Sequence, residues 1–309
     1  MHHRGNDNNT KKLMRKIIVT GSNGLIGRQI VNSLTNTKQY QVCGVSAGVN
    51  RNNHADFAFF QADITDINVF SKILKAFNPD IIIHTAAMGS PDKCEESKAE
   101  AWKINVDAPG FIAEYCRINN VFLLHWSTDF VFDGLKGYYN EDDEPNPVSY
   151  YGLTKLESEK VVLDTCIDAC VFRTILVYGA YPEMTRPNIF TRVIAAAAEN
   201  KNMRIACDQY RMPTFVDDLA NAVLLAVEKR PSGIFHLSGN EYMSVYEFVM
   251  KIAEKFNLDK NIFQPVLSSD LNEKAKRPAK TGFVLSKAIS DLGYNPTSIT
   301  NALMSLSNR

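Results

Sequence analysis

The hydrophobic pattern of the first half of the chain switches repeatedly between two periods. Short apolar, often β-branched runs are typical of buried strands, and we expect strands at residues 16–20, 41–46, 57–61, 80–85, 121–126 and 171–177. The stretches between these runs predict helices at residues 25–34, 68–77, 98–117 and 149–164. Repeated strand–helix alternation with right-handed crossovers predicts an α/β fold, with a doubly wound parallel sheet of Rossmann type.

The pattern changes after Gly179. Residues 181–188 contain Pro182 and Pro187 and are expected to form a loop. Further on we expect helices at residues 189–199, 216–228 and 244–256, strands at residues 203–206 and 233–237, and an irregular C-terminal portion. Ser244 followed by Glu247 is typical of a capping box at a helix N-terminus. The second half therefore predicts a separate, smaller region.

A glycine-rich turn follows the first predicted strand. Gly21, Gly24 and Gly27 have the spacing G-x-x-G-x-x-G between this strand and the helix after it. The first glycine permits a tight turn, the second lets the backbone approach a pyrophosphate, and the third lets the helix pack on the strand. The helix N-terminus then faces the phosphates. We therefore expect a dinucleotide cofactor here, held by Gly21, Asn23, Gly24, Leu25, Ile26 and Gly27.

These patterns predict the domain organisation. Residues 1–14 are polar and are expected to form a disordered tail. Residues 15–179 are expected to form an NAD(P)-binding Rossmann domain, and residues 180–309 mainly a substrate-binding region. Parts of the chain near residues 214–238 are expected to return to the Rossmann sheet.

Tyr151 and Lys155 lie one helical turn apart, shortly after the triplet Ser127-Thr128-Asp129. An ammonium beside a phenol favours the phenolate and lowers the pKa of the tyrosine from its ordinary value near ~10. Such a tyrosine can donate a proton near neutral pH, as carbonyl reduction requires. The pair therefore predicts a general acid and its charged neighbour.

Composition narrows the choice of partners. The 309 residues include 34 basic and 34 acidic side chains, so charge favours neither nucleic acid nor an anionic membrane as partner. The six cysteines include no C-x-x-C and do not cluster with histidines, so neither a disulfide scaffold nor a metal site is expected. The sequence has no signal-peptide pattern and no apolar run long enough to span a membrane. We therefore expect a cytoplasmic protein.

Several segments together carry a family resemblance. The glycine turn, STDFVFDG at residues 127–134 and SYYGLTK at residues 149–155 resemble the extended short-chain dehydrogenase/reductase superfamily. The segments HTAAMGSPDKCEES, RTILVYG, DQYRMPTFVDDLA and RPAKTGFVLSKA are similar to its dTDP-4-dehydrorhamnose reductase branch. This resemblance covers nearly the whole chain from about residue 15. It implies reduction of the C4 ketone of a nucleotide-linked 4-keto-6-deoxy sugar by NADPH or NADH.

The resemblance assigns catalytic roles residue by residue. It makes Tyr151 the general acid and Lys155 both the group that tunes its pKa and a ligand of the cofactor ribose. Thr128 corresponds to the hydroxyl that bonds the substrate oxygen, although a strand-end hydroxyl can also bond backbone. Asn105 corresponds to a position near the proton relay, and a helix amide that bonds backbone is the alternative.

Cofactor choice can be argued from the end of the second strand. NAD-selective sites usually place an acidic residue there to bind the ribose 2′-hydroxyl. Here the strand ends Gly44-Val45-Ser46, and Ser46 and Arg51 can bind a 2′-phosphate, unless Arg51 is simply a solvated cation. We therefore expect NADPH, with NADH possible. By resemblance, further cofactor contacts come from Asp63 and Ile64 near the adenine and from Ala86 and Ala87 near the ribose.

Substrate contacts are expected from Thr128, Asp129, Phe130, Gln209 and Arg277. The guanidinium of Arg277 has the geometry to pair with a diphosphate, and a surface ion pair is the alternative. The branch commonly carries tyrosine where this chain has Phe130, so one hydroxyl is missing. Because sites built for a sugar hydroxyl discriminate through such pairs, the identity of the sugar stays open.

Two other functions fit the same motifs. A nucleotide-sugar epimerase of the same superfamily would share the triplet and the Tyr-x-x-x-Lys pair. A non-catalytic NADP-binding regulatory subunit would bind another enzyme without turnover of its own. The usual destination of the reductase reaction is dTDP-rhamnose biosynthesis.

The predicted helices at residues 98–117 and 149–164 match those that pair between subunits in this superfamily, so we expect a homodimer.

Overall fold

The computed structural model describes residues 14–52, 57–181, 184 and 186–308. The predicted tail at residues 1–14 lies outside this part of the chain except for Met14, and so does Pro182 of the predicted loop.

The central sheet has seven parallel strands in the order β12-β7-β5-β4-β1-β2-β3. These strands are β1 (Arg15–Thr20), β2 (Tyr40–Ser46), β3 (Ala58–Gln61), β4 (Ile81–His84), β5 (Phe122–Thr128), β7 (Ala169–Thr174) and β12 (Gly233–Leu237). Because β1 pairs with both β2 and β4, the strand order reverses beside it. Doubly wound sheets bind their ligands beyond the carboxyl ends of the strands at such a reversal. The predicted Rossmann-type α/β fold is confirmed.

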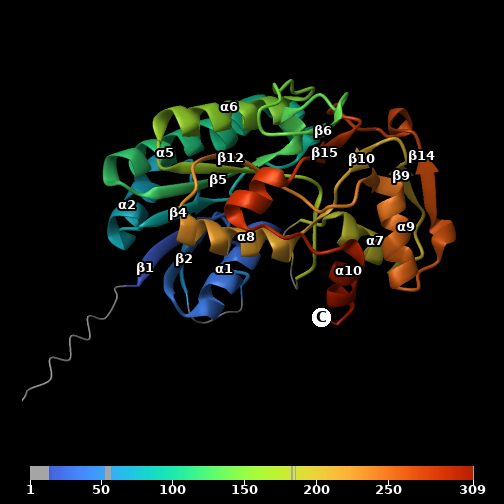
Figure 1. The fold of residues 1–309 in the computed structure, drawn as a ribbon, viewed down its shortest axis with the longest axis horizontal. Helices are drawn as coiled ribbons and strands as arrows, with labels where there is room; N and C mark the ends of the chain where they lie inside the picture. Colours follow the sequence, from blue (N-terminus) through green and yellow to red (C-terminus); the bar gives the residue numbers. More distant parts are fainter. Residues whose placement is uncertain (1–13, 53–56, 182–183, 185, 309) are drawn as a thin grey trace, which may run out of the picture.

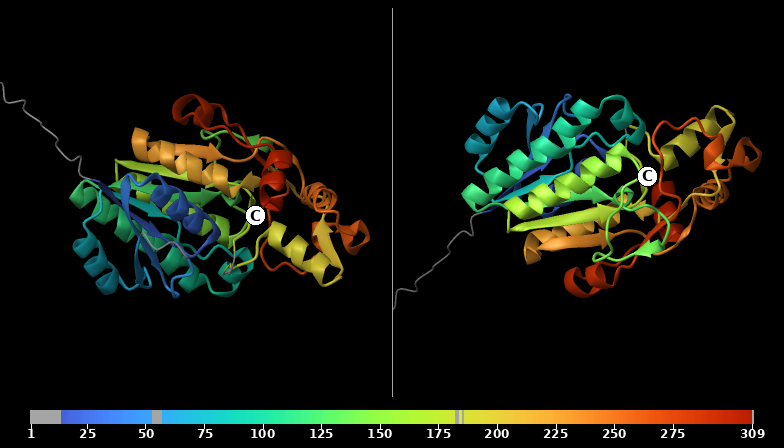
Figure 2. Two further views of the ribbon diagram at one scale, coloured as in Figure 1. Left: turned by 90° about the horizontal axis from the view of Figure 1, so that it is seen from below. Right: turned by 90° about the horizontal axis from the view of Figure 1, so that it is seen from above.

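Helices cover both faces of the sheet (Figures 1 and 2). One face carries α1 (Leu25–Thr37) and α8 (Val216–Lys229), and the other carries α2 (Ile67–Phe77), α5 (Ala108–Asn119) and α6 (Tyr150–Thr165). Alternate strand residues supply the two cores, since Ile17 and Val19 pack with α1 and α8 whereas Ile18 packs with α2 and α5. Strands buried on both faces explain the apolar runs in the sequence.

The predicted helix at residues 98–117 is interrupted. The structure forms α4 (Lys98–Trp102), a π turn (Lys103–Asp107) and then α5, preceded by the short α3 (Pro91–Glu96). Pro109 has no N–H and cannot bond the carbonyl of Asn105, so the helix widens at this point.

The predicted strand at residues 171–177 is likewise two strands. β7 ends at Thr174, and Leu176 then adopts a φ of 38°, which ends the extended backbone. The chain resumes as β8 (Val177–Tyr178), which pairs with β11 (Thr214–Phe215) outside the central sheet.

A third core lies in the C-terminal part of the chain, at the right-hand end of Figure 1. It is built mainly from α7 (Ile189–Ala198), β9 (Met203–Ala206), α9 (Val245–Lys255), β14 (Phe263–Val266) and α10 (Ile299–Ser307). The predicted capping box of α9 is confirmed, since Ser244 Oγ accepts from Glu247 N at 3.1 Å and Glu247 Oε2 accepts from Ser244 N at 2.7 Å. The expectation of an irregular C-terminal portion was wrong where β14 and α10 form.

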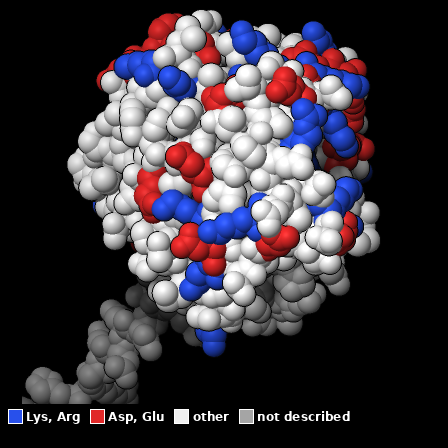
Figure 3. Space-filling view, turned by 90° about the vertical axis from the view of Figure 1, so that its right-hand side faces the viewer, with Lys and Arg blue, Asp and Glu red and all other residues white. Residues whose placement is uncertain are grey.

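A short strand pair joins the two halves, since β6 (Gly137–Tyr139) pairs with β15 (Thr281–Phe283). A second short pair, between β10 (Tyr210–Arg211) and β13 (Met243–Ser244), lies within the C-terminal half. Figure 3 shows the end of the molecule formed by the C-terminal part, where acidic and basic side chains are interspersed. Among the described residues, no helix has the length and apolar character needed to cross a membrane.

A buried ion pair joins α6 to the central sheet. Arg173 on β7 and Glu159 on α6 are 1% and 2% exposed, and the guanidinium contacts the carboxylate twice, at 2.9 and 2.7 Å. Ser127 Oγ also donates to Glu159, and Arg173 Nη1 lies 3.3 Å from His236 Nε2. Both charges are thus satisfied by several partners, which is the condition under which a buried pair is tolerated.

We predict that Arg173→Met lowers the free energy of unfolding by about 3–5 kcal/mol, because Glu159 is left buried without its cation. Arg117→Met, which breaks the exposed i,i+3 pair with Glu114, is the matched control and should change stability little. Urea unfolding monitored by circular dichroism measures both. Equal losses for the two variants would contradict the assignment, and the double variant Glu159→Leu/Arg173→Met should recover much of the loss.

Candidate active site

A cavity of about 730 Å³ opens beyond the carboxyl ends of the central strands. This volume lies in the range of small-molecule sites. Its lining combines Gly21 after β1, Thr85 after β4, Thr128 at the end of β5, Tyr151 at the start of α6 and Arg277 from the C-terminal part. The cavity therefore sits at the reversal of strand order and is bordered by both halves of the chain.

The glycine turn forms one wall of this cavity. Gly21 has a φ of +68°, and a Cβ there would lie 2.7 Å from the backbone nitrogen of Ala86. A Cβ on Gly27 would lie 2.3 Å from the carbonyl oxygen of Gly21, so glycine is required for α1 to pack this closely. Gly24 is the N-cap of α1 and provides no side-chain cap, and the first turn holds no acidic residue. The first amides of α1 are therefore left for an anion.

Most of the expected site residues line this one cavity. They are Gly21, Asn23, Gly24, Leu25, Ile26, Gly27, Ser46, Arg51, Ala86, Ala87, Thr128, Asp129, Phe130, Tyr151, Lys155 and Arg277. The fold thus brings Gly27 and Arg277, which are 250 positions apart in the sequence, to the same cavity.

Three expected contact residues lie outside the cavity lining. Asp63 is exposed and its Oδ1 accepts from Thr65 N at 2.9 Å, while Ile64 is buried in the core beside α2. Gln209 is 8% exposed, and its carbonyl accepts the N–H of Val245 at 2.9 Å. Their contacts with adenine and substrate remain predictions that require a bound ligand.

Asn105 also lies outside the lining and is fully buried in the π turn. Its Oδ1 accepts from Met88 N at 2.8 Å, and its Nδ2 donates to Met88 O at 3.3 Å and to Thr154 Oγ1 at 3.0 Å. These bonds tie the loop after β4 to α6. The backbone-bonding alternative for Asn105 therefore describes this structure.

Thr128, Phe130 and Tyr151 meet because two backbones pack in direct contact. Ser149 caps α6 by accepting from Gly152 N at 3.2 Å, which sets the helix start one residue before Tyr151. A Cβ on Gly152 would lie 2.1 Å from the carbonyl oxygen of Phe130. The rings of Phe130 and Tyr151 are edge to face at 5.4 Å between centroids. Gly152 therefore allows the helix start and the triplet to share one wall.

The pKa of Tyr151 differs in direction from the sequence-based expectation. Burial raises it above the ordinary value of 10, and the Asp129 carboxylate raises it further, while a hydrogen bond with Thr128 acts in the opposite direction. The expected lowering by Lys155 does not set the direction, because burial of the phenol is the largest effect on its pKa. Tyr151 is consequently a neutral phenol at neutral pH, which is the protonation state of a proton donor.

Lys155 is 3% exposed and its Nζ lies 3.3 Å from His125 Nε2. Burial lowers its pKa to about 8, against the opposing effect of the Glu159 carboxylate. Lys155 therefore loses its charge in the mildly alkaline range.

Asp129 is buried and already paired. Its carboxylate accepts from Thr281 Oγ1 at 2.5 Å and lies 3.5 Å from Arg211 Nε. Burial raises its pKa, although the Arg211 charge opposes this. Asp129 thus connects the triplet to the C-terminal strands β15 and β10 while its surface borders the cavity.

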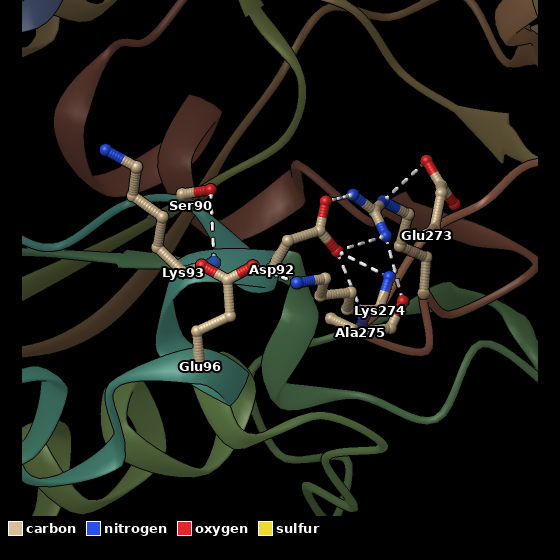
Figure 4. A network of polar contacts seen from close by, with 8 residues as sticks. Ser90, Asp92, Lys93, Glu96, Glu273, Lys274 and Ala275 are labelled. Carbon is tan, nitrogen blue, oxygen red and sulfur yellow. Dashed lines mark hydrogen bonds and ion pairs between the residues drawn. The ribbon is translucent and has the colours of Figure 1, made fainter.

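The guanidinium of Arg277 is held by carboxylates. It contacts Asp92 on α3 twice, at 3.2 and 3.0 Å, and Glu273 at 3.0 Å. Figure 4 shows Asp92 pointing from α3 toward the segment that holds Glu273, Lys274 and Ala275. The backbone nitrogens of Lys274 and Ala275 both donate to the carboxylate of Asp92. The ion-pair alternative for Arg277 describes this structure, and a diphosphate would have to displace Asp92.

Burial of Asp92 acts to raise its pKa, but the hydrogen bonds from Arg277 and from the backbone of Ala275 outweigh burial and lower the pKa. Asp92 therefore stays charged at neutral pH, and its pair with Arg277 joins α3 to the C-terminal part at the edge of the cavity.

Sequence reasoning missed two cationic residues of the cavity. Arg28 follows Gly27 directly and is 6% exposed, with its guanidinium 5.3 Å from the ring centroid of Tyr181. Arg186 comes from the loop after β8, and its Nη1 lies 3.4 Å from the Cβ position of Gly89. The position of Arg28 in the first turns of α1 was a usable signal, whereas nothing local marks Arg186.

The cavity is cationic although the whole chain is neutral. Its ionisable lining residues are Arg28, Arg51, Lys155, Arg186 and Arg277 on the basic side, with Asp129 on the acidic side. This distribution favours anionic ligands. Among the described residues, no group of three or more His, Cys, Asp or Glu side chains is arranged to hold a metal ion.

A seven-stranded parallel sheet that brings a glycine turn and a Thr-Tyr-Lys cluster to one cavity defines an extended short-chain dehydrogenase/reductase. The chain belongs to the RmlD substrate binding domain family, whose model matches residues 14–309.

The relatives include methionine adenosyltransferase subunits and dTDP-4-dehydrorhamnose reductases. The chain is 35% identical over 270 residues to methionine adenosyltransferase 2 subunit beta of Bos taurus, covering 85% of this chain and 78% of that protein. It is 29% identical over 306 residues to a dTDP-4-dehydrorhamnose reductase of Aggregatibacter actinomycetemcomitans, covering 95% and 98%. The crystal structure of dTDP-4-dehydrorhamnose reductase from Bacillus anthracis str. Ames in complex with NADP matches with a TM-score of 0.85 and 26% identity, covering 96% and 99%.

Proposed function

We propose that this protein reduces the C4 ketone of a nucleotide-linked 4-keto-6-deoxy sugar with NADPH, and that Tyr151 is the general acid. The observation that carries the proposal is that Thr128, Tyr151 and Lys155 line one cavity whose other wall is the glycine turn. Relatives named dTDP-4-dehydrorhamnose reductase support the choice of substrate class.

The proposed chemistry uses two hydroxyls. When bound, the nicotinamide supplies the hydride that adds to the carbonyl carbon. The phenol of Tyr151 and the hydroxyl of Thr128 stabilise the negative charge that develops on the carbonyl oxygen, and Tyr151 transfers its proton there. Lys155 lies one helical turn further along α6, where its charge would stabilise the phenolate left behind.

The residues around the glycine turn fit a dinucleotide with a 2′-phosphate. Gly21 and Gly27 provide the close backbone approach, and the amides at the start of α1 point to a phosphate site. Asn23 Oδ1 accepts the N–H of Arg51 at 3.1 Å, and Ser46 Oγ accepts the N–H of Asn23 at 3.3 Å. Ser46 and Arg51 are thus held together beside the turn, with no acidic residue among the cavity-lining residues next to them.

The cationic lining fits the diphosphate of a nucleotide sugar. Arg186 is exposed and borders the cavity near Gly89, whereas Arg277 must first exchange Asp92 for the ligand. We therefore propose Arg186 as the first diphosphate contact and Arg277 as a second one that forms after rearrangement. Phe130 lies against Tyr151 and would contact the sugar through an apolar ring, so the sugar is expected to lack a hydroxyl partner there.

A second function is favoured by one observation, the 35% identity to a protein named as a subunit of methionine adenosyltransferase. On that reading the chain binds another enzyme and NADP and has no turnover of its own. Thr128, Tyr151 and Lys155 in one cavity support catalysis instead, so we keep the subunit role as the alternative.

We predict that Tyr151→Phe lowers the rate of NADPH oxidation with dTDP-4-keto-6-deoxy sugar by roughly 100-fold or more, because the general acid is removed. Tyr150→Phe is the matched control, since Tyr150 packs under the Lys98 ammonium at 5.2 Å and does not line the cavity. The assay follows NADPH absorbance. If wild type oxidises no NADPH when the sugar is added and purifies with a stoichiometric protein partner, the subunit role replaces the reductase proposal.

Cofactor preference is tested at Arg51. Loss of a charge-assisted contact to the 2′-phosphate in Arg51→Ala should raise the dissociation constant of NADPH by about 10-fold or more and leave NADH unchanged. Arg117→Ala removes one positive charge on the exposed face of α5 and should change neither constant. Fluorescence titration measures the dissociation constants of both cofactors for wild type and the two variants. Comparable affinities of wild type for NADH and NADPH would contradict the proposed preference for NADPH.

We also propose a homodimer that pairs α5 and α6 of two chains. Ile112 of α5 is fully buried in the core, whereas Ile118 on α5 and Leu153 on α6 expose 61% and 37% of their surface. Light scattering at micromolar concentration should give twice the chain mass of 34.6 kDa, and Leu153→Lys should reduce it. A monomer mass for wild type would end the proposal.

A further inference from the structure

A row of buried polar side chains runs beneath the cavity, at the carboxyl ends of the central strands. Thr20, His84 and His125 are register partners on β1, β4 and β5. Thr20 Oγ1 lies 2.7 Å from His84 Nδ1, and the rings of His84 and His125 stack at 5.3 Å between centroids. His125 Nε2 in turn lies 3.3 Å from Lys155 Nζ. The row therefore leads from the glycine turn to the lysine of the proposed site.

Both imidazoles of this row are neutral. Burial and the charge of Lys155 lower the pKa of His84 to about 3, and the same two causes lower the pKa of His125 well below its ordinary value. A neutral imidazole carries one N–H and one acceptor nitrogen. His125 can therefore accept from the ammonium of Lys155 through Nε2 when its proton is on Nδ1.

The charge of Lys155 and the tautomer of His125 are coupled. Ser158 Oγ donates to Lys155 O at 2.8 Å and also lies 2.9 Å from His125 Nε2. A proton on Nε2 suits Ser158 but repels an ammonium, whereas an unprotonated Nε2 accepts from it. With the ammonium present, the proton of His125 lies on Nδ1, which has no hydrogen-bond partner among the described residues. The Ser158 hydroxyl then donates to Nε2 in place of Lys155 O.

We propose that His125 is a positioning residue that holds the ammonium of Lys155 in the cavity wall and keeps it charged. The proposal rests on the proposed function, because Lys155 matters there as a charged group beside the cofactor and Tyr151. Other groups that act on the lysine charge are Glu159 on α6 and Cys94 on α3, with the neutral His84 behind His125. His125 differs from them in making the direct hydrogen bond.

The sign of the effect follows from which form of Lys155 is bonded. His125 Nε2 accepts only from a lysine nitrogen that carries a proton to donate, and the ammonium is the stronger donor. Removing the acceptor therefore disfavours the charged form and lowers the pKa of Lys155 further. As pH rises, a His125 variant would then lose any function that needs the ammonium at a lower pH than wild type does. A purely structural role of His125 would instead lower stability without moving this midpoint.

The test is an NMR titration of the protein labelled with 13C at the lysine Cε, with the Lys155 signal assigned from Lys155→Arg. His125→Leu should move the Lys155 midpoint down by about one pH unit or more, the size expected for a lost hydrogen bond to a charged group. His125→Gln retains an acceptor oxygen and should restore most of the shift. His84→Leu, which removes the other imidazole of the row without a direct contact to Lys155, is the matched control and should leave the midpoint close to that of wild type.

An unchanged Lys155 midpoint in His125→Leu, with only a fall in melting temperature, would overturn the proposal. If His125→Leu does not fold, His125→Met tests the same loss with a flexible apolar side chain, and the same criterion applies. The titration uses no ligand, so it is decided separately from sugar reduction. In an active reductase, the alkaline limb of kcat/KM should shift with the NMR midpoint, and failure of the sugar assay would leave the titration result standing.

Discussion

The ion pair between Arg173 and Glu159 is the interaction on which the site depends, because it fixes α6 against the sheet. Tyr151, Lys155, Ser158 and Glu159 recur at helical spacing along α6 and share the face that meets the strand ends. This face is polar, so apolar burial alone cannot set the position of the helix. Glu159 meets Arg173 and Ser127, Ser158 meets His125, and Lys155 meets His125 in turn. The position of Tyr151 in the cavity follows from these contacts together with the backbone contact between Gly152 and Phe130.

Features with a local cause could be predicted from the sequence. The apolar runs give the strands of the central sheet because parallel strands buried on both faces admit few polar residues. The glycine turn is visible because Gly21 and Gly27 stand where a Cβ would collide with backbone. The spacing of Tyr151 and Lys155 correctly indicates one helix face. Even the errors in element boundaries have local causes, at Pro109 and at the left-handed Leu176.

Features that depend on long-range contacts could not be predicted. The Arg277 guanidinium is paired with Asp92, which lies 185 positions earlier in the sequence. No sequence pattern marks that contact. The expected lowering of the pKa of Tyr151 by Lys155 fails for a similar reason, since the burial that raises this pKa comes from tertiary packing that local spacing does not show. Local spacing shows which side chains can meet, but burial and third partners decide the direction of each pKa shift.

The buried ionisable groups of the site lower the stability of the fold, and this bears on whether the chain is an enzyme or a binding subunit. Lys155 is buried with its pKa lowered to about 8, and His84 and His125 are neutral imidazoles that each keep one ring nitrogen without a partner among the described residues. Buried polar groups of this kind reduce stability relative to apolar side chains of the same size. A chain that served only to bind another enzyme through its surface would need none of them at the strand ends. Strongly perturbed ionisable groups at a cavity mark candidate functional sites. Tyr151 and Lys155 border the cavity and the two imidazoles lie behind Lys155, which supports the proposed reductase over the subunit role.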